Sequence, residues 1–291
     1  MMYKYSLDKS SKKFICPSCG KKTFVKYVEV ETNSYLEASI GRCDRESKCS
    51  YHLAPNGNKT LVTLSNPVIQ PEPSCHDDGV IGAYGRDYKN NQNHFVTYLL
   101  KYFRSEDVIK AIKKYHIGTS TYWDGATIFW QVDEQLNVCA GKVMLYDEVT
   151  GKRVKQPKVR INWMHRILGI DTFVLQQCLF GMHNIIDYEL GKTVCIVESE
   201  KTAVILSIIY PTFLWLATGS KSNLKEALLK PLKSYNITLF PDKTEFKDWH
   251  LKSQSLRRLG YNIECSDLLE HKNLDEGDDL VDFLNLEELV A

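Results

Sequence analysis

Residues 192–211 read KTVCIVESEKTAVILSIIYP, and within this stretch the spacing of apolar residues changes from that of a strand to that of a helix. The first part, 193–197, is an apolar run that predicts a buried strand. A polar turn at Glu198 and Ser199 follows, and the helical pattern then extends to Tyr210. The stretch therefore predicts a buried strand that leads through an acidic turn into a helix.

The same alternation of strand and helix continues to the end of the chain. Three further apolar runs, FLWLATG, ITLF and YNIEC, occupy residues 213–219, 237–240 and 261–265. Helices are expected at about 222–229, 245–259 and 279–289. Alternating elements whose strands are almost continuously apolar form a parallel sheet covered on both faces. The segment 191–291 is therefore expected to be an α/β domain with a parallel sheet flanked by helices.

Carboxylates occupy the ends of these strands. Glu198 follows the first strand, the second ends at Gly219, and Asp242 follows the third, while Asp279 and Asp282 can fold back to the same edge. Carboxylates at one edge of a sheet repel one another unless a divalent cation lies among them, and oxygen ligands of this kind favour Mg²⁺. Two other roles stay open: each acidic residue can cap a helix, and Glu198 can transfer protons if its pKa is raised.

Four cysteines near the amino terminus have the spacing of a metal site. Cys16, Cys19, Cys43 and Cys49 are arranged as C-x2-C-x23-C-x5-C around two β-like runs. Two such pairs place four thiolates around one ion, so residues 1–60 are expected to form a zinc β-ribbon with structural zinc. His52 is an alternative fourth ligand to Cys49, and unrelated buried thiols are the alternative to a metal site.

Cations surround these cysteines. Lys21, Lys22 and Arg42 alternate with aromatic residues such as Phe24 and Tyr51. Cations beside exposed aromatic rings suit single-stranded nucleic acid, which binds through its phosphates and by base stacking. A solvated lysine face over a small aromatic core, or a surface that docks a protein, explains the same pattern.

Between the ribbon and the α/β domain the chain changes character twice. Residues 61–94 are rich in Pro, Gly and Asn and are expected to form a linker. Residues 95–190 then predict two helices followed by β-like runs at 126–132, 138–146 and 154–159, which together make a mixed α+β segment. This segment carries a basic set that favours a phosphate-lined surface, although a solvated sheet face is the commoner explanation. Its proposed nucleic-acid contacts are Lys142, Arg153, Lys155, Lys158 and Arg160.

Composition limits the class of protein without deciding its function. The 291 residues are 43% hydrophobic and 25% charged, and the net charge of +1 is unevenly spread. Residues 1–60 hold 11 Lys and Arg against 6 Asp and Glu, whereas residues 261–291 hold 1 against 10. The sequence has neither an uninterrupted apolar run of membrane-spanning length nor a signal-type apolar core, which predicts a cytoplasmic protein without a membrane partner.

The acidic motifs resemble those of the Toprim domain, a catalytic module shared by bacterial primases, topoisomerases and some nucleases. The matching stretches are VESEKTA after the apolar strand, then ATG, LFPD and DDLVDFL. The resemblance implies that Glu198 is the glutamate of the first motif, although Ser199 stands where glycine is usual. Asp242 matches the first aspartate of the second motif, whereas Thr244 stands where the second aspartate is expected. Asp279 and Asp282 resemble a trailing acidic motif.

The order of segments extends the resemblance to most of the chain. A zinc ribbon, a linker, a basic mixed segment and a Toprim domain follow one another in bacterial replicative primases, and QCLFGMHNII resembles their entry into Toprim. The chain also resembles zinc-ribbon and Toprim proteins carried on mobile elements of Bacteroides-type bacteria. The resemblance implies Mg²⁺ or Mn²⁺ at the acidic site, single-stranded DNA and NTPs as ligands, and a helicase or other replication protein as a partner.

The leading hypothesis is therefore a primase-like nucleotidyltransferase that synthesises primers during replication of a mobile element. Two alternatives remain: a Toprim module that binds DNA with little or no catalysis, and a Toprim nuclease. Because Thr244 replaces an expected ligand, a second metal would need compensation from Glu200, Glu245 or Asp248.

Overall fold

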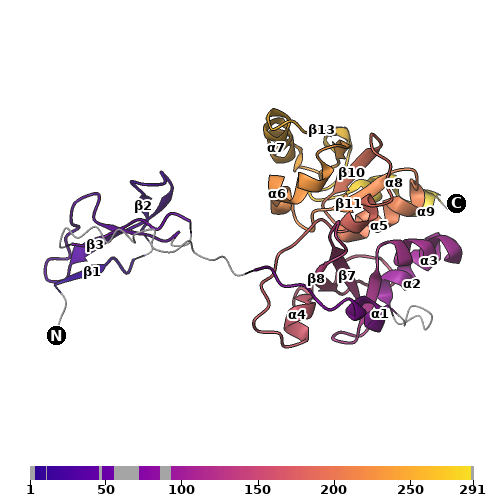
Figure 1. Cartoon of the computed structure of the whole chain (residues 1–291), viewed down its shortest axis with the longest axis horizontal. Coiled ribbons are helices and arrows are strands. Elements are labelled where there is room, and N and C mark those ends of the chain that lie inside the picture. The colour runs from indigo at the N-terminus through magenta and orange to yellow at the C-terminus, as the bar shows by residue number, and fades with distance from the viewer. Residues whose placement is uncertain (1–3, 11, 46–47, 56–71, 86–92, 290–291) are drawn as a thin grey trace. The chain divides into compact units, whose positions relative to one another are not determined.

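The computed structural model describes residues 4–10, 12–45, 48–55, 72–85 and 93–289. The chain divides into two compact units, Met1–Pro71 and Glu72–Ala291 (Figure 1). The expected linker, 61–94, lies partly outside the described residues. Its described part includes one helix, α1 (Gly79–Tyr84).

The first unit is an antiparallel sheet of short strands. They are β1 (Tyr5–Leu7), β2 (Phe14–Ile15), β3 (Lys22–Glu29), β4 (Gly41–Cys43) and β5 (His52–Leu53), ordered β1-β3-β4-β5 with β2 also paired to β3. Phe24 is fully buried and packs with Cys16 and Cys43. A Cβ on Gly41 would lie 2.3 Å from the carbonyl oxygen of Val25, so the close approach of β4 to β3 requires glycine. So small an apolar core stabilises a fold weakly, which is why such modules depend on a metal.

The second unit begins with helices and an antiparallel sheet. After α1 come α2 (His94–Tyr102), α3 (Ser105–Lys114), β6 (Ile117–Ser120), β7 (Ala126–Val132), β8 (Val138–Met144), β9 (Ile161–Trp163) and α4 (Met164–Ile167). The strands are ordered β6-β7-β8-β9. The β-like run at 154–159 is not a strand; after an isolated bridge between Tyr146 and Arg153 the chain is irregular until β9.

The start of α2 is tied to this sheet by the buried side chain of Asn93. Its Oδ1 accepts hydrogen bonds from the backbone N–H of Phe95 and Val96 and from the hydroxyl of Thr127. Its Nδ2 donates to the carbonyl of Gly118. We expect Asn93→Ala to lower the free energy of unfolding by about 2 kcal/mol, because it removes a helix cap and leaves buried polar groups unpaired. Urea denaturation measures this change, and a loss below about 0.5 kcal/mol would contradict it.

The remainder of the second unit is a parallel sheet with helices, as the sequence predicts. Its strands are β10 (Thr193–Val197), β11 (Leu214–Ala217), β12 (Asn236–Leu239) and β13 (Asn262–Cys265), ordered β11-β10-β12-β13 and all parallel. Its helices are η2 (Met182–Ile185), α5 (Glu200–Ile209), η3 (Lys221–Asn223), α6 (Glu226–Leu229), η4 (Lys230–Leu232), α7 (Phe246–Arg258), η5 (Leu268–His271), α8 (Leu280–Leu284) and α9 (Leu286–Leu289).

Both faces of this sheet are covered, which confirms the α/β prediction. In β10, Val194 and Ile196 pack into one apolar cluster that includes Trp249 of α7. Cys195 and Val197 point to the opposite face and pack into a second cluster that includes residues of α5. The helix expected at 279–289 is interrupted at Asn285, whose φ of 47° is left-handed, so it becomes α8 and α9.

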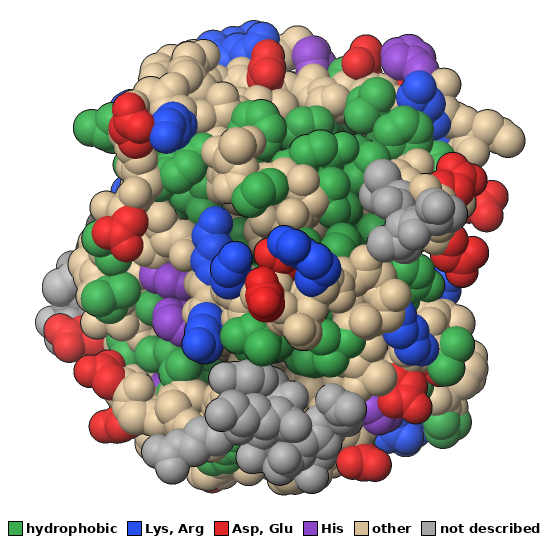
Figure 2. Space-filling model, turned by 90° about the vertical axis from the view of Figure 1, so that its right-hand side faces the viewer, with side chains coloured by type: hydrophobic (Ala, Val, Ile, Leu, Met, Phe, Trp, Pro, Cys, Tyr) green, Lys and Arg blue, Asp and Glu red, His purple; other side chains and the backbone are tan. Residues whose placement is uncertain are grey.

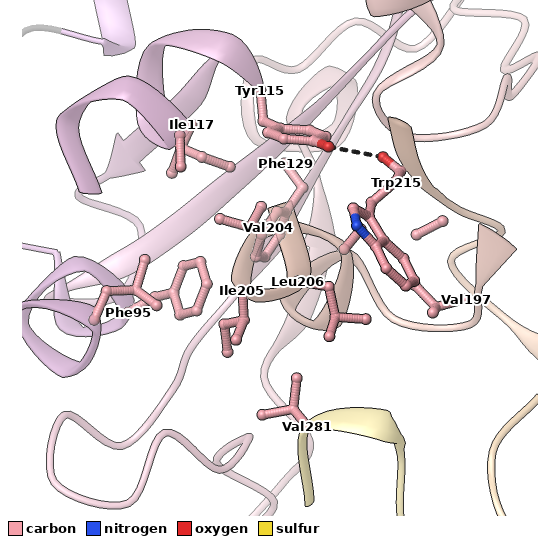
Figure 3. Close-up of a cluster of buried hydrophobic side chains, with 14 of the residues drawn as sticks. Phe95, Tyr115, Ile117, Phe129, Val197, Val204, Ile205, Leu206, Trp215 and Val281 are labelled. Carbon is pink, nitrogen blue, oxygen red and sulfur yellow. Dashed lines mark hydrogen bonds between the residues drawn. The ribbon is translucent and has the colours of Figure 1, made fainter. Parts of the chain in front are cut away.

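The antiparallel and parallel sheets share one apolar core. Phe95 and Phe129 of the antiparallel part lie in the same buried cluster as Val204 of α5 and Val281 of α8 (Figure 3). The hydroxyl of Tyr115 donates a hydrogen bond to the carbonyl oxygen of Trp215 at 2.8 Å. Because one core spans both sheets, groups from the antiparallel part are held firmly against the edge of the parallel sheet.

Charge on the surface is mixed on the side where α2, α3 and the C-terminal end lie. Lys and Arg side chains there alternate with Asp, Glu and exposed hydrophobic side chains (Figure 2). Within the described part of the chain, no helix combines the length and apolar character needed to cross a membrane.

Candidate functional site

A cavity of about 700 Å³ lies in the second unit, at the carboxyl ends of β10 and β12. Both acidic and basic residues line its wall. The acidic residues are Asp147, Glu198, Glu200, Asp242, Glu276, Asp278, Asp279 and Asp282. The basic residues are Lys142, Lys152, Arg153, Lys155 and Lys201.

Strand register brings Glu198 and Asp242 to the same part of this wall. β10 and β12 are neighbours, with Ile196 opposite Leu239, so each acidic residue follows its strand at the same edge. The backbone N–H of Phe240 donates to the carbonyl of Ile196 at 2.8 Å and continues the pairing to the strand ends. The parallel sheet thus gathers the two acidic motifs that lie 44 positions apart in the sequence.

The acidic loop before α8 folds back onto this edge. The N–H of Lys243 donates to the carbonyl of Asp278 at 2.8 Å, and the N–H of Gly277 donates to the carbonyl of Lys243 at 3.2 Å. The ammonium of Lys243 also donates to the carbonyls of Leu269, Glu270 and Lys272 at 2.9–3.0 Å. Lys243 therefore holds the loop in place, and Asp279 and Asp282 line the same cavity as Asp242.

Burial, followed by the charges of neighbouring carboxylates, raises the pKa values of three carboxyl groups in this cavity. Burial, followed by the charges of Asp279 and Glu198, raises the pKa of Asp242 to about 8. Burial is also the main cause of the raised pKa of Glu198 and of Asp282. The carboxylate of Asp242 forms no hydrogen bond or ion pair within the described residues. Glu198 and Asp242 offer carboxylate oxygens, the ligand type that Mg²⁺ and Mn²⁺ prefer, and a cation bound to them would offset the repulsion among these groups.

Asp279 already has hydrogen-bond partners for both of its carboxylate oxygens. Its Oδ1 accepts from the backbone N–H of Val281 at 2.8 Å and of Asp282 at 3.1 Å. Its Oδ2 accepts from the hydroxyl of Thr202. Asp282 in turn accepts from the N–H of Asp279 at 3.0 Å, which completes a capping box at the start of α8. Of the roles that the sequence leaves open for Asp279, helix capping is therefore the one that the structure shows.

The residues considered as replacements for a second aspartate have other positions or partners. Thr244 has a left-handed φ of 78°, and its N–H donates to Glu270 at 2.7 Å. Glu245 forms an ion pair with Lys221 at 2.8 Å. Neither Thr244 nor Glu245 lines the cavity, nor does the exposed Asp248. Of the three candidates, Glu200 lines the cavity but is ion-paired.

The ion pair of Glu200 with Lys142 is buried and connects the two sheets. The ammonium lies 2.9 Å and 3.2 Å from the two carboxylate oxygens and 2.8 Å from the carbonyl oxygen of Gly219. The side chains are only 9% and 2% exposed. Gly219 has a φ of 73°, and a Cβ there would lie 2.8 Å from the carboxylate of Glu200. Three hydrogen bonds therefore hold Lys142, which was predicted to contact nucleic acid, inside the protein.

The remaining predicted contacts of the middle segment divide into two groups. Arg153 and Lys155 are exposed and line the cavity. Lys158 and Arg160 do not line it, and the guanidinium of Arg160 lies 5.7 Å from the ring centroid of Trp123. Sequence reasoning missed Lys201 as a site residue. The signal for it was its position three residues after Glu198.

The zinc centre in the first unit has the geometry that zinc requires. The Sγ atoms of the four cysteines lie within 4.8 Å of one another, with 3.6 Å between Cys16 and Cys49 and 3.9 Å between Cys19 and Cys43. Tetrahedral coordination with Zn–S bonds of about 2.3 Å places sulfur atoms about 3.8 Å apart. His52 is not part of this group, because its Nε2 is hydrogen-bonded to the hydroxyl of Tyr27 at 2.9 Å. Cys49 is therefore the fourth thiol of the zinc ribbon.

The surface of the ribbon differs from the expected one. Lys21 and Lys22 are exposed, but Phe24 is fully buried and the hydroxyl of Tyr51 donates to the carbonyl of Ser39. Phe24 and Tyr51 therefore belong to the small aromatic core. A cation–π cluster lies elsewhere, with the ammonium of Lys26 4.3 Å from the ring centroid of Phe14.

We expect the purified full-length chain to contain one zinc ion per molecule. Cys19→Ser should lower the zinc content, because it removes one of the four thiolates that close the site. His52→Ala should retain full zinc content, since the imidazole is held by Tyr27. Metal analysis of the three proteins checks this assignment, and loss of zinc from His52→Ala alone would overturn it.

Three solved structures are similar to the chain at low sequence identity. The primase fragment of the bacteriophage T7 primase-helicase protein is 13% identical, with a TM-score of 0.45 and 94% coverage of each chain. The DnaG catalytic core is 15% identical, with a TM-score of 0.47 and coverage of 72% of this chain and 74% of that chain. The zinc-binding and RNA polymerase domains of the Aquifex aeolicus primase are 12% identical, with a TM-score of 0.42 and coverage of 98% and 79%. No curated protein matches the chain.

Two family models match the sequence. Residues 3–61 match a zinc beta-ribbon finger family, in agreement with the four-thiol cluster. Residues 93–243, 151 of the 291 residues, match the family described as "Domain of unknown function (DUF6371)". That match begins at the Asn93 cap and ends one residue after Asp242, so it includes the basic segment and both acidic strand ends. With more than half of its length matched, the chain belongs to the DUF6371 family.

Proposed function

We propose that the cavity of the second unit catalyses primer synthesis, a nucleotidyl transfer from NTPs on a single-stranded DNA template that depends on Mg²⁺ or Mn²⁺. The observation that carries this proposal is that acidic and basic side chains line the same cavity. Glu198 and Asp242 offer oxygen ligands for a cation, while exposed Arg153 and Lys155 offer positive charge to phosphates. A nucleoside triphosphate with its metal ion needs both.

In this reaction the 3′-hydroxyl oxygen bonds to the α-phosphorus of the incoming nucleotide. Pyrophosphate leaves with the electron pair of the broken P–O bond, and the proton of the hydroxyl passes to solvent water. Glu198 and Asp242 would hold the cation, which would supply positive charge to the transferring phosphoryl group and lower the pKa of the attacking hydroxyl. Arg153, Lys155 and Lys152 bind the polyphosphate and orient its α-phosphorus toward the acidic residues of the cavity. The buried ion pair between Lys142 and Glu200 holds β8 against the start of α5 beside the cavity.

The rest of the chain serves this reaction in the proposal. The zinc ribbon of residues 1–60 contacts single-stranded DNA through Lys21, Lys22 and Arg42. Residues 61–94 link it to the basic segment 95–190 and the Toprim-like segment 191–291. Such a chain acts in replication of a mobile element together with a helicase or another replication protein.

A second candidate function is a Toprim-like module that binds nucleic acid without catalysis. Asp279 is occupied as a helix cap, and Thr244 lies outside the cavity where a second aspartate was expected. Asp242 and Glu198 are then the principal carboxylate ligands of the cavity. Two carboxylates suit the binding of one cation better than the binding of two.

A comparison of Lys155→Gln with Lys158→Gln tests the proposed phosphate contact. Both lysines are exposed, but Lys155 lines the cavity and Lys158 does not. We expect Lys155→Gln to weaken NTP binding about tenfold or more, because it removes a charge-assisted contact, and Lys158→Gln to leave it unchanged. The measurement is primer synthesis from labelled NTPs on single-stranded DNA as a function of NTP concentration.

Each other outcome points to a different function. Equal effects of the two substitutions would contradict the placement of the triphosphate in this cavity. Cleavage of the DNA without synthesis would indicate a nuclease. Salt-sensitive DNA binding without any product from the wild-type chain would favour the binding module.

A further inference from the structure

Three cysteines lie close together outside both sites described above. Four of the nine cysteines form the zinc centre, and Cys195 and Cys265 belong to strands of the parallel sheet. Cys75, Cys139 and Cys178 remain, and they come from three distant parts of the chain. Cys75 is exposed, while the other two are half-buried.

Strand pairing places Cys75 opposite Cys139. The backbone N–H of His76 donates to the carbonyl of Val138 at 2.8 Å, and these two residues form an antiparallel bridge. In an antiparallel pair, the residue before one bridge partner faces the residue after the other. Cross-strand neighbours have Cβ atoms about 4.5–5.5 Å apart, close enough for a disulfide after a small adjustment of the backbone.

An irregularity in β8 frees Cys139 for this contact. The register between β7 and β8 passes from Gln131 opposite Ala140 to Val132 opposite Val138. Cys139 is thus the extra residue of a bulge and has no opposite residue on β7. Bulges redirect side chains, and this one lies beside the segment that contains Cys75.

The surroundings of the three thiols agree with this arrangement. The Sγ of Cys139 donates weakly to the carboxylate of Asp133 at 3.6 Å. Burial and then the nearby Cys139, Asp133 and Asp78 raise the pKa of Cys75. A hydrogen bond with Cys139 is the first cause of the raised pKa of Cys178. Cys139 therefore lies between an exposed thiol and a more buried one.

We propose that Cys75 and Cys139 form a reversible cross-strand disulfide. With a low-molecular-weight disulfide such as oxidised glutathione as oxidant, the exposed Cys75 thiolate attacks one glutathione sulfur and releases one glutathione thiolate. The Cys139 thiolate then attacks the Cys75 sulfur of the mixed disulfide and releases the second glutathione. The two protein thiols are oxidised, the glutathione disulfide is reduced, and the two protons are taken up by the glutathione thiolates.

The bond would fasten the segment 72–78 to β8. This is the first described part of the second unit, and it follows the undescribed residues that lead from the zinc ribbon. The reduced protein holds it by the hydrogen bond from His76 to Val138, by two hydrogen bonds between Ser74 and Val174, and by packing of the buried His76 ring against Phe173. A covalent bond at Cys75 removes the freedom of this segment to detach.

Peptide mapping by mass spectrometry tests the proposal on the full zinc-containing chain after incubation with oxidised glutathione. The medium is mildly alkaline because the raised pKa of Cys75 slows thiolate attack at neutral pH. We expect a linked peptide pair containing Cys75 and Cys139 with two hydrogens lost, which disappears on addition of dithiothreitol. Zinc content measured in parallel shows that the ribbon thiols are not involved.

Two single variants separate this pair from its neighbour. Cys75→Ser, at an exposed position, should fold normally and abolish the link, whereas Cys178→Ser should retain it. Oxidation should raise the Tm of the wild-type chain and of Cys178→Ser but not of Cys75→Ser. A link between Cys139 and Cys178, or stable attachment of glutathione to Cys75 without a protein disulfide, would overturn the proposal.

Discussion

Asp242→Asn is expected to stabilise the metal-free protein and at the same time to abolish its response to Mg²⁺. The carboxyl group of Asp242 is buried beside Glu198, Asp279 and Asp282, and this environment raises its pKa to about 8. A neutral amide avoids the cost of burying a charge and the repulsion by the neighbouring carboxylates, so the free energy of unfolding in the presence of a chelator should rise by about 2 kcal/mol. Urea denaturation in chelator measures the gain.

The same substitution should remove the cation site. In the wild-type chain, Mg²⁺ or Mn²⁺ should raise the Tm, because a ligand that binds only the folded state stabilises it. Asp242→Asn should show no such rise and should lose primer synthesis by at least about 100-fold. Glu198→Gln should behave in the same way, since both residues line the same cavity.

Asp248→Asn is the matched control for this experiment. Asp248 is exposed, lies six positions after Asp242 and does not line the cavity. It should retain wild-type stability, cation response and activity. If Mg²⁺ raises the Tm of Asp242→Asn as much as that of the wild type, Asp242 does not hold the cation. If wild type responds to Mg²⁺ but makes no product, the cation site exists and the proposed catalysis is wrong.

Lys142→Met is expected to destabilise the protein by about 3–5 kcal/mol, because it leaves the carboxylate of Glu200 buried without its partner. The double variant Lys142→Met with Glu200→Gln should recover much of this loss, since neither remaining group is charged. Urea denaturation of the wild type, both single variants and the double variant completes the cycle and measures the coupling between the two residues.

Lys152→Met is the control for the role of charge in the cavity. Lys152 is an exposed lysine of the same cavity, so its substitution should weaken NTP binding without changing stability. If Lys142→Met instead leaves the stability unchanged and weakens the binding of single-stranded DNA, Lys142 contacts nucleic acid, as the sequence predicts.

Local patterns in the sequence were sufficient for the zinc ribbon and for the strands of the parallel sheet. The apolar run at 193–197 coincides with β10, and ITLF lies within one residue of β12 at Asn236–Leu239. The spacing of four cysteines predicted a zinc ribbon whose thiols do lie together. These predictions succeed because periodicity, strand-end position and metal-ligand spacing are determined by residues near one another in the chain.

Some partners of Lys142 and Asp279 lie far from them in the sequence, so the residue pattern did not reveal them. Lys142 was predicted to contact nucleic acid, but its ammonium forms a buried ion pair with Glu200, which lies 58 positions away in the sequence. Asp279 stays a predicted metal ligand, and the structure adds that its own helix and Thr202 already donate hydrogen bonds to both of its oxygens. In both cases burial forces a polar group to take the nearest partner, and the identity of that partner depends on packing.

The sequence alone therefore predicted a zinc ribbon, a basic segment and a parallel sheet with acidic strand ends, because each depends on local spacing. The choice between His52 and Cys49 required the hydrogen bond from Tyr27. The two sheets share one apolar core, and only this packing places Arg153 and Lys155 in the same cavity as Glu198 and Asp242. Hydrophobic periodicity does not predict such contacts between distant residues. They form only when separate apolar faces pack together and bring the polar residues beside them into one site.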